Sequence, residues 1–258
     1  VMLSGDGNLV LIHDETVNRT TNGKGSVSEL TLEELKKLDA GCKFDPRFRR
    51  QRIPTIYEAT EAISGYDLSA NIEIKPAKGH EGETGWALGR YLATEWPTNL
   101  IAPIISSFSA EALESVAVEA PGFPRALLVD RVPRNWRAQT KRLGCSLLHC
   151  NQGHLRKAEA EKIRETGLHL VCYTVNNARK ARNLWGWGVN AVISDHPDRL
   201  LDISGMRAMT SRDATEPVLF EFRVIVHQLI GEIGEVVTFP PKTLTSGASP
   251  FGASTSRT

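Results

Sequence analysis

The chain has 258 residues, of which 41% are apolar and 24% are charged, and its formal net charge is +1 at pH 7. This length suits one domain with a substantial core, and a barrel of alternating strands and helices typically needs about 250 residues. The balanced charge favours neither a nucleic acid nor an anionic membrane as a partner of the whole molecule, and no apolar run approaches the roughly 20 residues of a membrane span.

The chain opens with a predicted β-hairpin. Two apolar segments, Val1–Leu3 and Asn8–Ile12, flank the sequence Ser-Gly-Asp-Gly, and Asp-Gly between apolar runs is a good hairpin signal. The second strand ends at His13, directly before Asp14. Histidine is the usual general acid or base near neutral pH. A lone histidine in such a place is more often a hydrogen-bonded structural residue, so this position does not by itself indicate catalysis.

Residues 14–53 form a polar excursion after this hairpin. One helix is predicted over Glu29–Leu38, with Ser28 or Thr31 as its N-cap and Gly41 near its end. We expect this segment to be a small cap that is inserted over one mouth of the domain.

From residue 70 to about residue 200, short apolar runs alternate with helical stretches. The predicted strands, rich in Val, Ile or Leu as buried parallel strands are, are Ala70–Lys75, Ile104–Phe108, Arg125–Asp130, Ser146–Cys150, His169–Val175 and Ala191–Ser194. The predicted helices are Thr84–Thr94, Ser109–Glu119, Leu155–Thr166 and Asn177–Trp185. Such alternation predicts a parallel α/β fold, either a barrel or a doubly wound sheet. No Gly-x-Gly-x-x-Gly follows a strand, which disfavours a dinucleotide-binding sheet.

Residues 206–258 differ in composition from the preceding strands and helices and are predicted to form an atypical C-terminal tail. Pro217–Phe239 is apolar and strand-like, and two interpretations of it stay open: an unrelated tail, or a segment that covers an exposed sheet edge. Pro240–Thr258 is rich in Ser, Thr, Gly and Pro, and we expect it to be disordered because it offers too little apolar area to bury.

The four cysteines show no close Cys-x-x-Cys spacing; they are Cys42, Cys145, Cys150 and Cys172. A zinc site or a disulfide framework would show tighter patterning. We therefore expect reduced thiols and a cytoplasmic protein.

The segment Asn71-Ile72-Glu73-Ile74-Lys75 is unusual for a buried strand. Side chains alternate along a strand, so Ile72 and Ile74 face one way while Glu73 and Lys75 face the other. Charges are rarely buried unless they are paired or bound to a metal. At the carboxyl end of a barrel strand, a carboxylate can bind a hard cation and a lysine can bind a phosphate oxygen. A simple ion pair between Glu73 and Lys75 explains the pattern equally well.

Taken together, these segments resemble the glycerophosphodiester phosphodiesterase family, and most closely its bacterial cytoplasmic type. The resemblance is carried by GDGNLVLIHDETVNRTTNGKG at 5–25, IPTIYE at 53–58 and NIEIK at 71–75, and continues through SSF at 106–108, LLVD at 127–130, LGC at 143–145, YTVN at 173–176 and WGV at 187–189. It spans about residues 1–200, and both the order and the spacing of the motifs fit.

The resemblance implies a TIM barrel over residues 1–205, with a small insertion after its second strand at 14–53. It implies one divalent cation, Mg²⁺ or Ca²⁺, held by three acidic residues, and two histidines that act as acid and base. Its products are glycerol 3-phosphate and an alcohol such as choline. It gives His13 the role of the second histidine, Glu73 that of the third metal ligand, and Lys75 that of a phosphate contact. Arg19 takes a structural or phosphate-facing role. Phe108, Tyr173 and His149 are possible pocket residues; His149, whose position in a predicted strand would let it face the barrel interior, is more often a packed strand residue in such a place.

The chain departs from this family pattern at its start. The family's His-Arg-Gly motif does not occur, and the Glu-x-Asp motif that should precede Val1 is absent. We therefore expect a barrel that lacks its first strand and most of its second. Three interpretations stay open: a metal-dependent enzyme that hydrolyses small glycerophosphodiesters, a catalytically inactive homologue, and a related phosphodiesterase that acts on whole lipids. Nucleic acid is not an expected partner.

Overall fold

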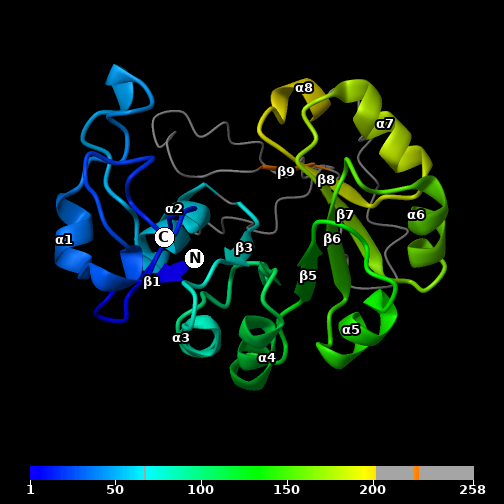
Figure 1. Cartoon of the computed structure of the whole chain (residues 1–258), viewed down its shortest axis with the longest axis horizontal. Helices are drawn as coiled ribbons and strands as arrows, with labels where there is room; N and C mark the ends of the chain where they lie inside the picture. The colour runs from blue at the N-terminus through cyan, green and yellow to red at the C-terminus, as the bar shows by residue number, and fades with distance from the viewer. Residues whose placement is uncertain (67, 202–223, 227–258) are drawn as a thin grey trace, which may run out of the picture.

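The computed structural model describes residues 1–66, 68–201 and 224–226, and these residues are arranged around one curled parallel sheet (Figure 1). Its strands pair in chain order: β3 (Asn71–Ile74), β4 (Ile104–Ser107), β5 (Arg125–Val129), β6 (Leu147–Asn151), β7 (His169–Tyr173), β8 (Ala191–Ser194) and β9 (Val224–Val226). Every neighbouring pair is parallel. The six strands predicted between residues 70 and 200 are confirmed, each to within about two residues at its ends.

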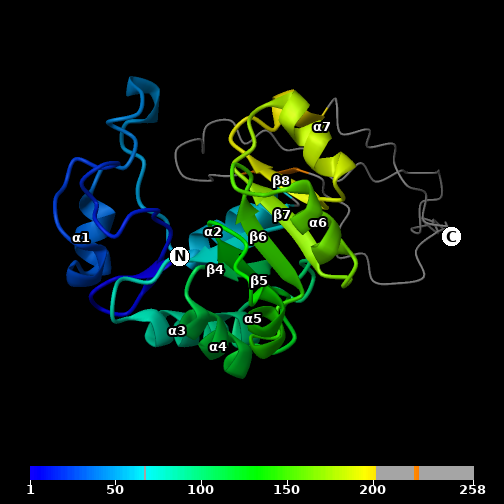
Figure 2. The ribbon, with the colours of Figure 1, turned by 45° about the vertical axis from the view of Figure 1, so that its right-hand side comes forward.

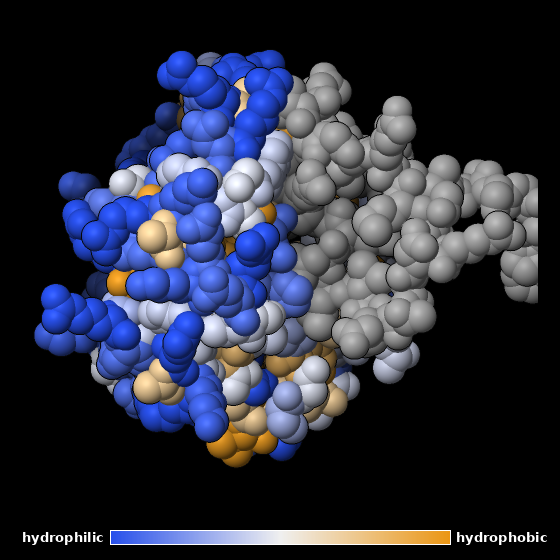
Figure 3. Space-filling model, turned by 90° about the vertical axis from the view of Figure 1, so that its right-hand side faces the viewer, coloured by the Kyte–Doolittle hydropathy of each residue, from blue (hydrophilic) through white to orange (hydrophobic). Residues whose placement is uncertain are grey.

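Helices follow the strands and lie on the outer side of the curled sheet, as Figures 1 and 2 show from two directions. They are α2 (Ile56–Gly65), α3 (Glu81–Thr94), α4 (Ala110–Glu119), α5 (Trp136–Arg142), α6 (Lys157–Arg164), α7 (Ala178–Gly186) and α8 (Asp198–Leu201). Their outer surfaces are largely hydrophilic on the side where α6 and α7 lie (Figure 3). The fold is therefore an α/β barrel of which the described residues form an incomplete circuit.

Apolar side chains pack on both faces of the sheet. The residues that face the helices include Leu127, Leu148, Leu170 and Val192 and form one core cluster. Their strand neighbours Ala126, Leu147, Val171 and Ala191 form a second cluster on the concave face. A sheet that buries both faces, one against helices and one against itself, is the arrangement of a barrel interior.

The predicted hairpin is confirmed and extends this sheet. Strands β1 (Met2–Leu3) and β2 (Leu9–Val10) are antiparallel. Val1 lies beside β3, because its amine donates to the carbonyl of Glu73 and its carbonyl accepts from the amide of Lys75 at 2.9 Å. Val1 thus bonds to the two residues on either side of Ile74, which is the hydrogen-bond pattern of parallel strands. The hairpin therefore holds His13 and its surroundings against the end of β3.

The second hairpin strand is shorter than predicted. The amide of Leu11 bonds to the carbonyl of Pro54 at 2.8 Å, and Val10 bridges to Thr55. The chain therefore leaves the hairpin after Leu11 and returns beside the same residues at Pro54 and Thr55. The 14–53 excursion between these points has its own apolar cluster around Val17, Val27, Leu35 and Ile53.

The helix predicted over Glu29–Leu38 begins later than expected, and α1 covers Leu32–Lys37. Thr31 is its N-cap and forms a capping box with Glu34, which fixes the start of the helix. Val27–Glu29 form a separate 3-10 turn before it.

The predicted tail at 206–258 lies outside the described residues except at 224–226. Those three residues form β9, which pairs in parallel with β8. This is the position expected of a segment that covers a sheet edge. Within the described ranges, no helix is long and apolar enough to cross a membrane.

Candidate active site

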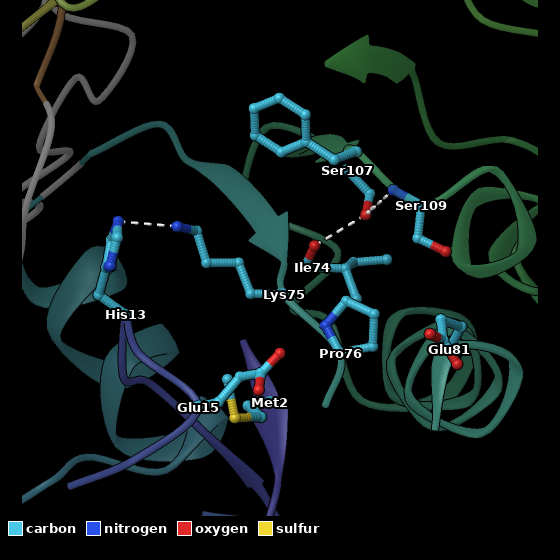
Figure 4. A pocket seen from close by; sticks show the side chains of 10 residues that line it. Met2, His13, Glu15, Ile74, Lys75, Pro76, Glu81, Ser107 and Ser109 are labelled. Atoms are coloured by element: carbon cyan, nitrogen blue, oxygen red, sulfur yellow. Dashed lines mark hydrogen bonds between the residues drawn. The ribbon is translucent and has the colours of Figure 1, made fainter. Parts of the chain in front are cut away.

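A cavity of about 520 Å³ opens where β3 and β4 end, between the sheet and the start of the 14–53 insertion. It is lined by Met2, His13, Glu15, Ile74, Lys75, Pro76, Glu81, Ser107, Phe108 and Ser109. Figure 4 shows that Lys75 extends from the end of β3 towards His13, with Glu15 and Met2 beside them. Barrel enzymes keep their active sites at this carboxyl end of the strands.

A chain of four polar side chains crosses the mouth of the cavity. Lys75 Nζ lies 2.7 Å from His13 Nε2, and His13 Nδ1 lies 2.8 Å from Asp14 Oδ1. Arg19 donates to both oxygens of Asp14, at 2.6 and 2.8 Å. The structure thus brings together the predicted residues His13, Lys75 and Arg19, and it adds Asp14 as the link between them.

These contacts assign the tautomer of His13. A carboxylate only accepts hydrogen bonds, so His13 Nδ1 carries a proton that it donates to Asp14. Nε2 then has a free electron pair that accepts from the ammonium of Lys75. The hydrogen bonds from Arg19 hold the pKa of Asp14 well below its ordinary value, so Asp14 stays ionised. His13 is therefore poised with its reactive nitrogen towards the cavity and a fixed negative charge behind it.

Glu73 lies on the concave face of the sheet, as predicted, one residue below the cavity lining. Its Oε1 atom is 3.7 Å from Lys75 Nζ, which makes an ion pair too long for a hydrogen bond, and no described residue forms a hydrogen bond to it. An unpartnered carboxylate oxygen beside a cavity fits one ligand of a hard divalent cation. Among the described residues, however, no group of three acidic, histidine or cysteine side chains could hold a metal ion. The residues present therefore do not complete a ligand set.

Two aromatic residues predicted for the pocket contact each other. The rings of Phe108 and Tyr173 meet edge to face with centroids 6.1 Å apart. Phe108 is about half exposed and lines the cavity, whereas Tyr173 stands behind it and donates its hydroxyl to the carbonyl of Val129 at 2.9 Å. Burial raises the pKa of Tyr173, so this phenol stays neutral. The pair forms an apolar wall.

His149 is placed differently from the other predicted pocket residues. It is fully buried, and neither ring nitrogen has a hydrogen-bond partner in the part of the chain that the structure describes. It lies two residues after Leu147 in β6, so the two side chains point to the same face of the sheet, and Leu147 belongs to the concave-face cluster. His149 therefore faces the barrel interior below the cavity and does not line the cavity. Burial lowers its pKa to about 3, so it is neutral at pH 7.

Asp14 and Glu15 are site residues that the sequence did not single out. Asp14 positions His13, and Glu15 contributes a carboxylate to the cavity wall. Their position directly after the candidate histidine is the sequence feature that could have indicated them.

Known proteins resemble this chain over nearly all of its barrel. The glycerophosphoryl diester phosphodiesterase family matches residues 1–199. The glycerophosphodiester phosphodiesterase of Caldanaerobacter subterraneus subsp. tengcongensis is 37% identical over 208 residues, covering 79% of this chain and 83% of that protein. One from Bacillus subtilis is 30% identical over 218 residues, covering 77% and 72%.

A solved structure shows the same fold at similar identity. It is a phosphodiesterase from Oleispira antarctica in complex with the product sn-glycerol-3-phosphate. It is 36% identical to this chain with a TM-score of 0.76, and the match covers 79% of this chain and 82% of that one. Sequence and fold agree with the family resemblance of the motifs around His13 and Glu73, and the chain belongs to the glycerophosphodiester phosphodiesterase family.

Proposed function

We propose that the cavity between β3 and the insertion hydrolyses glycerophosphodiesters to glycerol 3-phosphate and an alcohol. The observation that carries this proposal is the 2.7 Å contact between Lys75 Nζ and His13 Nε2 at the cavity mouth. Lys75, which would bind the phosphate, and His13, which would give a proton to the leaving alcohol, therefore lie on the same wall of the cavity. The related Oleispira antarctica enzyme, whose structure holds sn-glycerol-3-phosphate, supports the same substrate class.

Lys75 binds a phosphate oxygen in this proposal. A charge-assisted contact between an ammonium and a phosphate is stronger than the neutral contact to an imidazole, so bound substrate takes Lys75 away from His13. His13 Nε2 can then accept a proton. The carboxylate of Asp14, held by Arg19, stabilises the imidazolium that results.

His13 acts as the general acid. Water forms a new bond to phosphorus and releases one proton to the solvent, while the bond between phosphorus and the alcohol oxygen breaks. His13 Nε2 gives its proton to that oxygen and is afterwards reprotonated from the solvent. General acid catalysis of this kind contributes about 10²- to 10⁴-fold. The apolar wall of Phe108 and Tyr173 faces the organic part of the substrate.

Glu73 is the proposed ligand of a divalent cation. The family generally depends on such an ion, and a hard cation would neutralise charge on the phosphodiester. Mg²⁺ and Ca²⁺ are the two candidates, since both prefer carboxylate oxygens. We also propose a cytoplasmic location, because all four cysteines are free thiols.

Incubation with glycerophosphocholine or with lysophosphatidylcholine, each with Mg²⁺ or Ca²⁺, tests this function. Release of glycerol 3-phosphate from the soluble diester supports the proposal. Turnover of the lipid alone would instead indicate a lipid-acting phosphodiesterase. No turnover of either by a folded chain would indicate a catalytically inactive homologue.

A further inference from the structure

The tip of the insertion concentrates the positive charge of the molecule. Residues 41–52, here called the basic tip, contain five basic residues and one acidic residue, Asp45, which gives a net charge of +4. The basic residues are Lys43, Arg47, Arg49, Arg50 and Arg52. The whole chain has a net charge of only +1, so the remainder is negative and the positive field is local to this segment.

The basic tip projects from the rest of the molecule. Both Figure 1 and Figure 2 show this part of the chain, beyond α1, extending away from the barrel. A 3-10 turn at Pro46–Phe48 shapes its end, and Asp45 caps this turn by accepting from the amide of Arg47 at 2.8 Å. At the base, Gly41 lies so close to the carbonyl of Phe48 that a Cβ would come within 1.7 Å of that oxygen. The tip therefore has a defined shape.

Its cations divide into three groups. Arg47 forms an ion pair with Asp45 and its guanidinium lies over the ring of Phe48, so its contacts stay within the tip. Lys43 donates to the carbonyl of Asn18, and Arg52 donates to carbonyls at the end of α1, so these two side chains support the loop. Arg49 and Arg50 are exposed, and within the described chain their guanidinium groups take part in no hydrogen bond or ion pair. They are available to bind an anionic surface.

An exposed aromatic residue accompanies these cations. Phe44 is 70% exposed, and its ring meets that of Phe48 at 5.4 Å between centroids. A single exposed apolar residue needs no explanation. An exposed phenyl among several arginines, at the end of a projecting loop, is the pattern of a segment that lies at the headgroup level of a membrane.

We propose that the basic tip docks this protein on an anionic phospholipid surface. Arg49 and Arg50 contact lipid phosphates, and Phe44 enters the boundary between headgroups and acyl chains. A single-stranded nucleic acid would fit a groove in which cations and several aromatic faces alternate along its path, whereas the tip is compact with one exposed ring. The insertion that carries the tip starts beside His13 and Glu15, which line the cavity, so a docked molecule has its cavity at the base of the same insertion. The benefit to catalysis rests on the proposed function, but the docking does not.

Vesicle sedimentation of the full chain tests this proposal. One set of vesicles is phosphatidylcholine alone, and in the other about a third of the lipid is phosphatidylglycerol. We expect binding to the anionic set only, and weaker binding as salt is raised. The double variant Arg49→Gln/Arg50→Gln should weaken it about thirtyfold, since each arginine near such a surface contributes roughly fivefold. Phe44→Ser should weaken it further.

The matched control is Arg179→Gln/Arg182→Gln, which removes two exposed cations from α7 and should bind like the parent chain. Thermal unfolding of each variant shows that the fold is intact, and the assay needs no turnover. Equal binding by the tip and α7 variants, or binding to neutral vesicles, would overturn the proposal. So would binding to a single-stranded RNA oligonucleotide without binding to anionic vesicles.

Discussion

Lys75 Nζ lies 2.7 Å from His13 Nε2, although the two residues are 62 positions apart in the chain. This contact exists because the hairpin that ends near His13 is bonded to β3 through the backbone of Val1 and Lys75. An ammonium and an imidazole form such a hydrogen bond only when one of them is neutral. Here the ammonium of Lys75 donates and Nε2 of the neutral His13 ring accepts. In the proposed reaction, a phosphate that binds Lys75 removes the hydrogen-bond donor from His13 Nε2, and that nitrogen can then accept a proton.

Replacing Lys75 by methionine tests its role as the phosphate contact. Lys75→Met keeps the aliphatic stem and removes the charge, and we expect kcat/KM for glycerophosphocholine to fall about 10- to 100-fold, since a hydrogen bond to a charged group contributes about 1.5–3 kcal/mol. Most of the loss should be in KM. Lys78→Met, at an exposed lysine outside the cavity lining, is the control. Equal kinetics of the two variants would remove Lys75 from the site.

The pair formed by Arg19 and Asp14 makes a prediction about pH. Arg19 lowers the pKa of Asp14, so Arg19→Met should let that pKa rise towards its ordinary value. A protonated Asp14 cannot stabilise the imidazolium of His13, so the variant should lose rate relative to the parent chain as the pH falls from about 5.5 to about 3.5, the range around the ordinary pKa of an aspartate. The readout is the ratio of the two kcat values across this range.

Arg156→Met is the control for this measurement, because Arg156 pairs with Glu159 on α6, away from the cavity. A ratio that stays constant with pH for Arg19→Met would show that Arg19 does not act through the ionisation of Asp14.

His149 should make the fold sensitive to acid. Its pKa is about 3 in the folded chain and near 6.5 when exposed, so between these values only the unfolded chain binds the proton. The free energy of unfolding should therefore decrease by about 1.4 kcal/mol for each unit that the pH falls within this window, from this group alone. His149→Leu should reduce the slope by that amount in urea unfolding at about pH 6 and pH 4.5. An unchanged slope would contradict the burial of His149; His80→Leu, at a half-exposed histidine, is the matched substitution.

A close approach between two helices predicts a packing effect. A Cβ added to Gly85 of α3 would lie 2.3 Å from the carbonyl oxygen of Ala112 on α4. Gly85→Ala should therefore cost about 1–3 kcal/mol of stability, as overpacking usually does. Gly65→Ala, at the end of α2 where a Cβ meets nothing within 4 Å, should change stability by less than about 0.5 kcal/mol or increase it. Equal unfolding midpoints would contradict the helix contact.

The parallel strands could be predicted because each is a short apolar run between turn signals. Three helices, α2, α5 and α8, were not predicted, and α8 is only four residues long. Helix α5 is only seven residues long and mostly polar, so it carries no apolar stripe. Helix α2 does start with a recognisable capping box at Thr55 and Glu58, which is a local signal that the prediction did not use.

The site was predicted as separate residues rather than as an arrangement. Family motifs indicated His13, Lys75 and Glu73, and strand alternation placed Glu73 and Lys75 on one face. The contact between Lys75 and His13 depends on how the hairpin packs on β3, which is a long-range backbone interaction with no local signal. The use of Asp14 follows from its position next to His13, but its ion pair with Arg19 requires the fold of the insertion.

The central claim is that His13 protonates the leaving alcohol of a glycerophosphodiester. The most direct measurement is ³¹P NMR of glycerophosphocholine with the parent chain, His13→Gln and the control His80→Gln, each with Mg²⁺ or Ca²⁺ and each shown to be folded. We expect conversion to glycerol 3-phosphate by the parent chain and by His80→Gln, and a rate at least about 10²-fold lower for His13→Gln. Equal conversion by His13→Gln and the parent chain would contradict it.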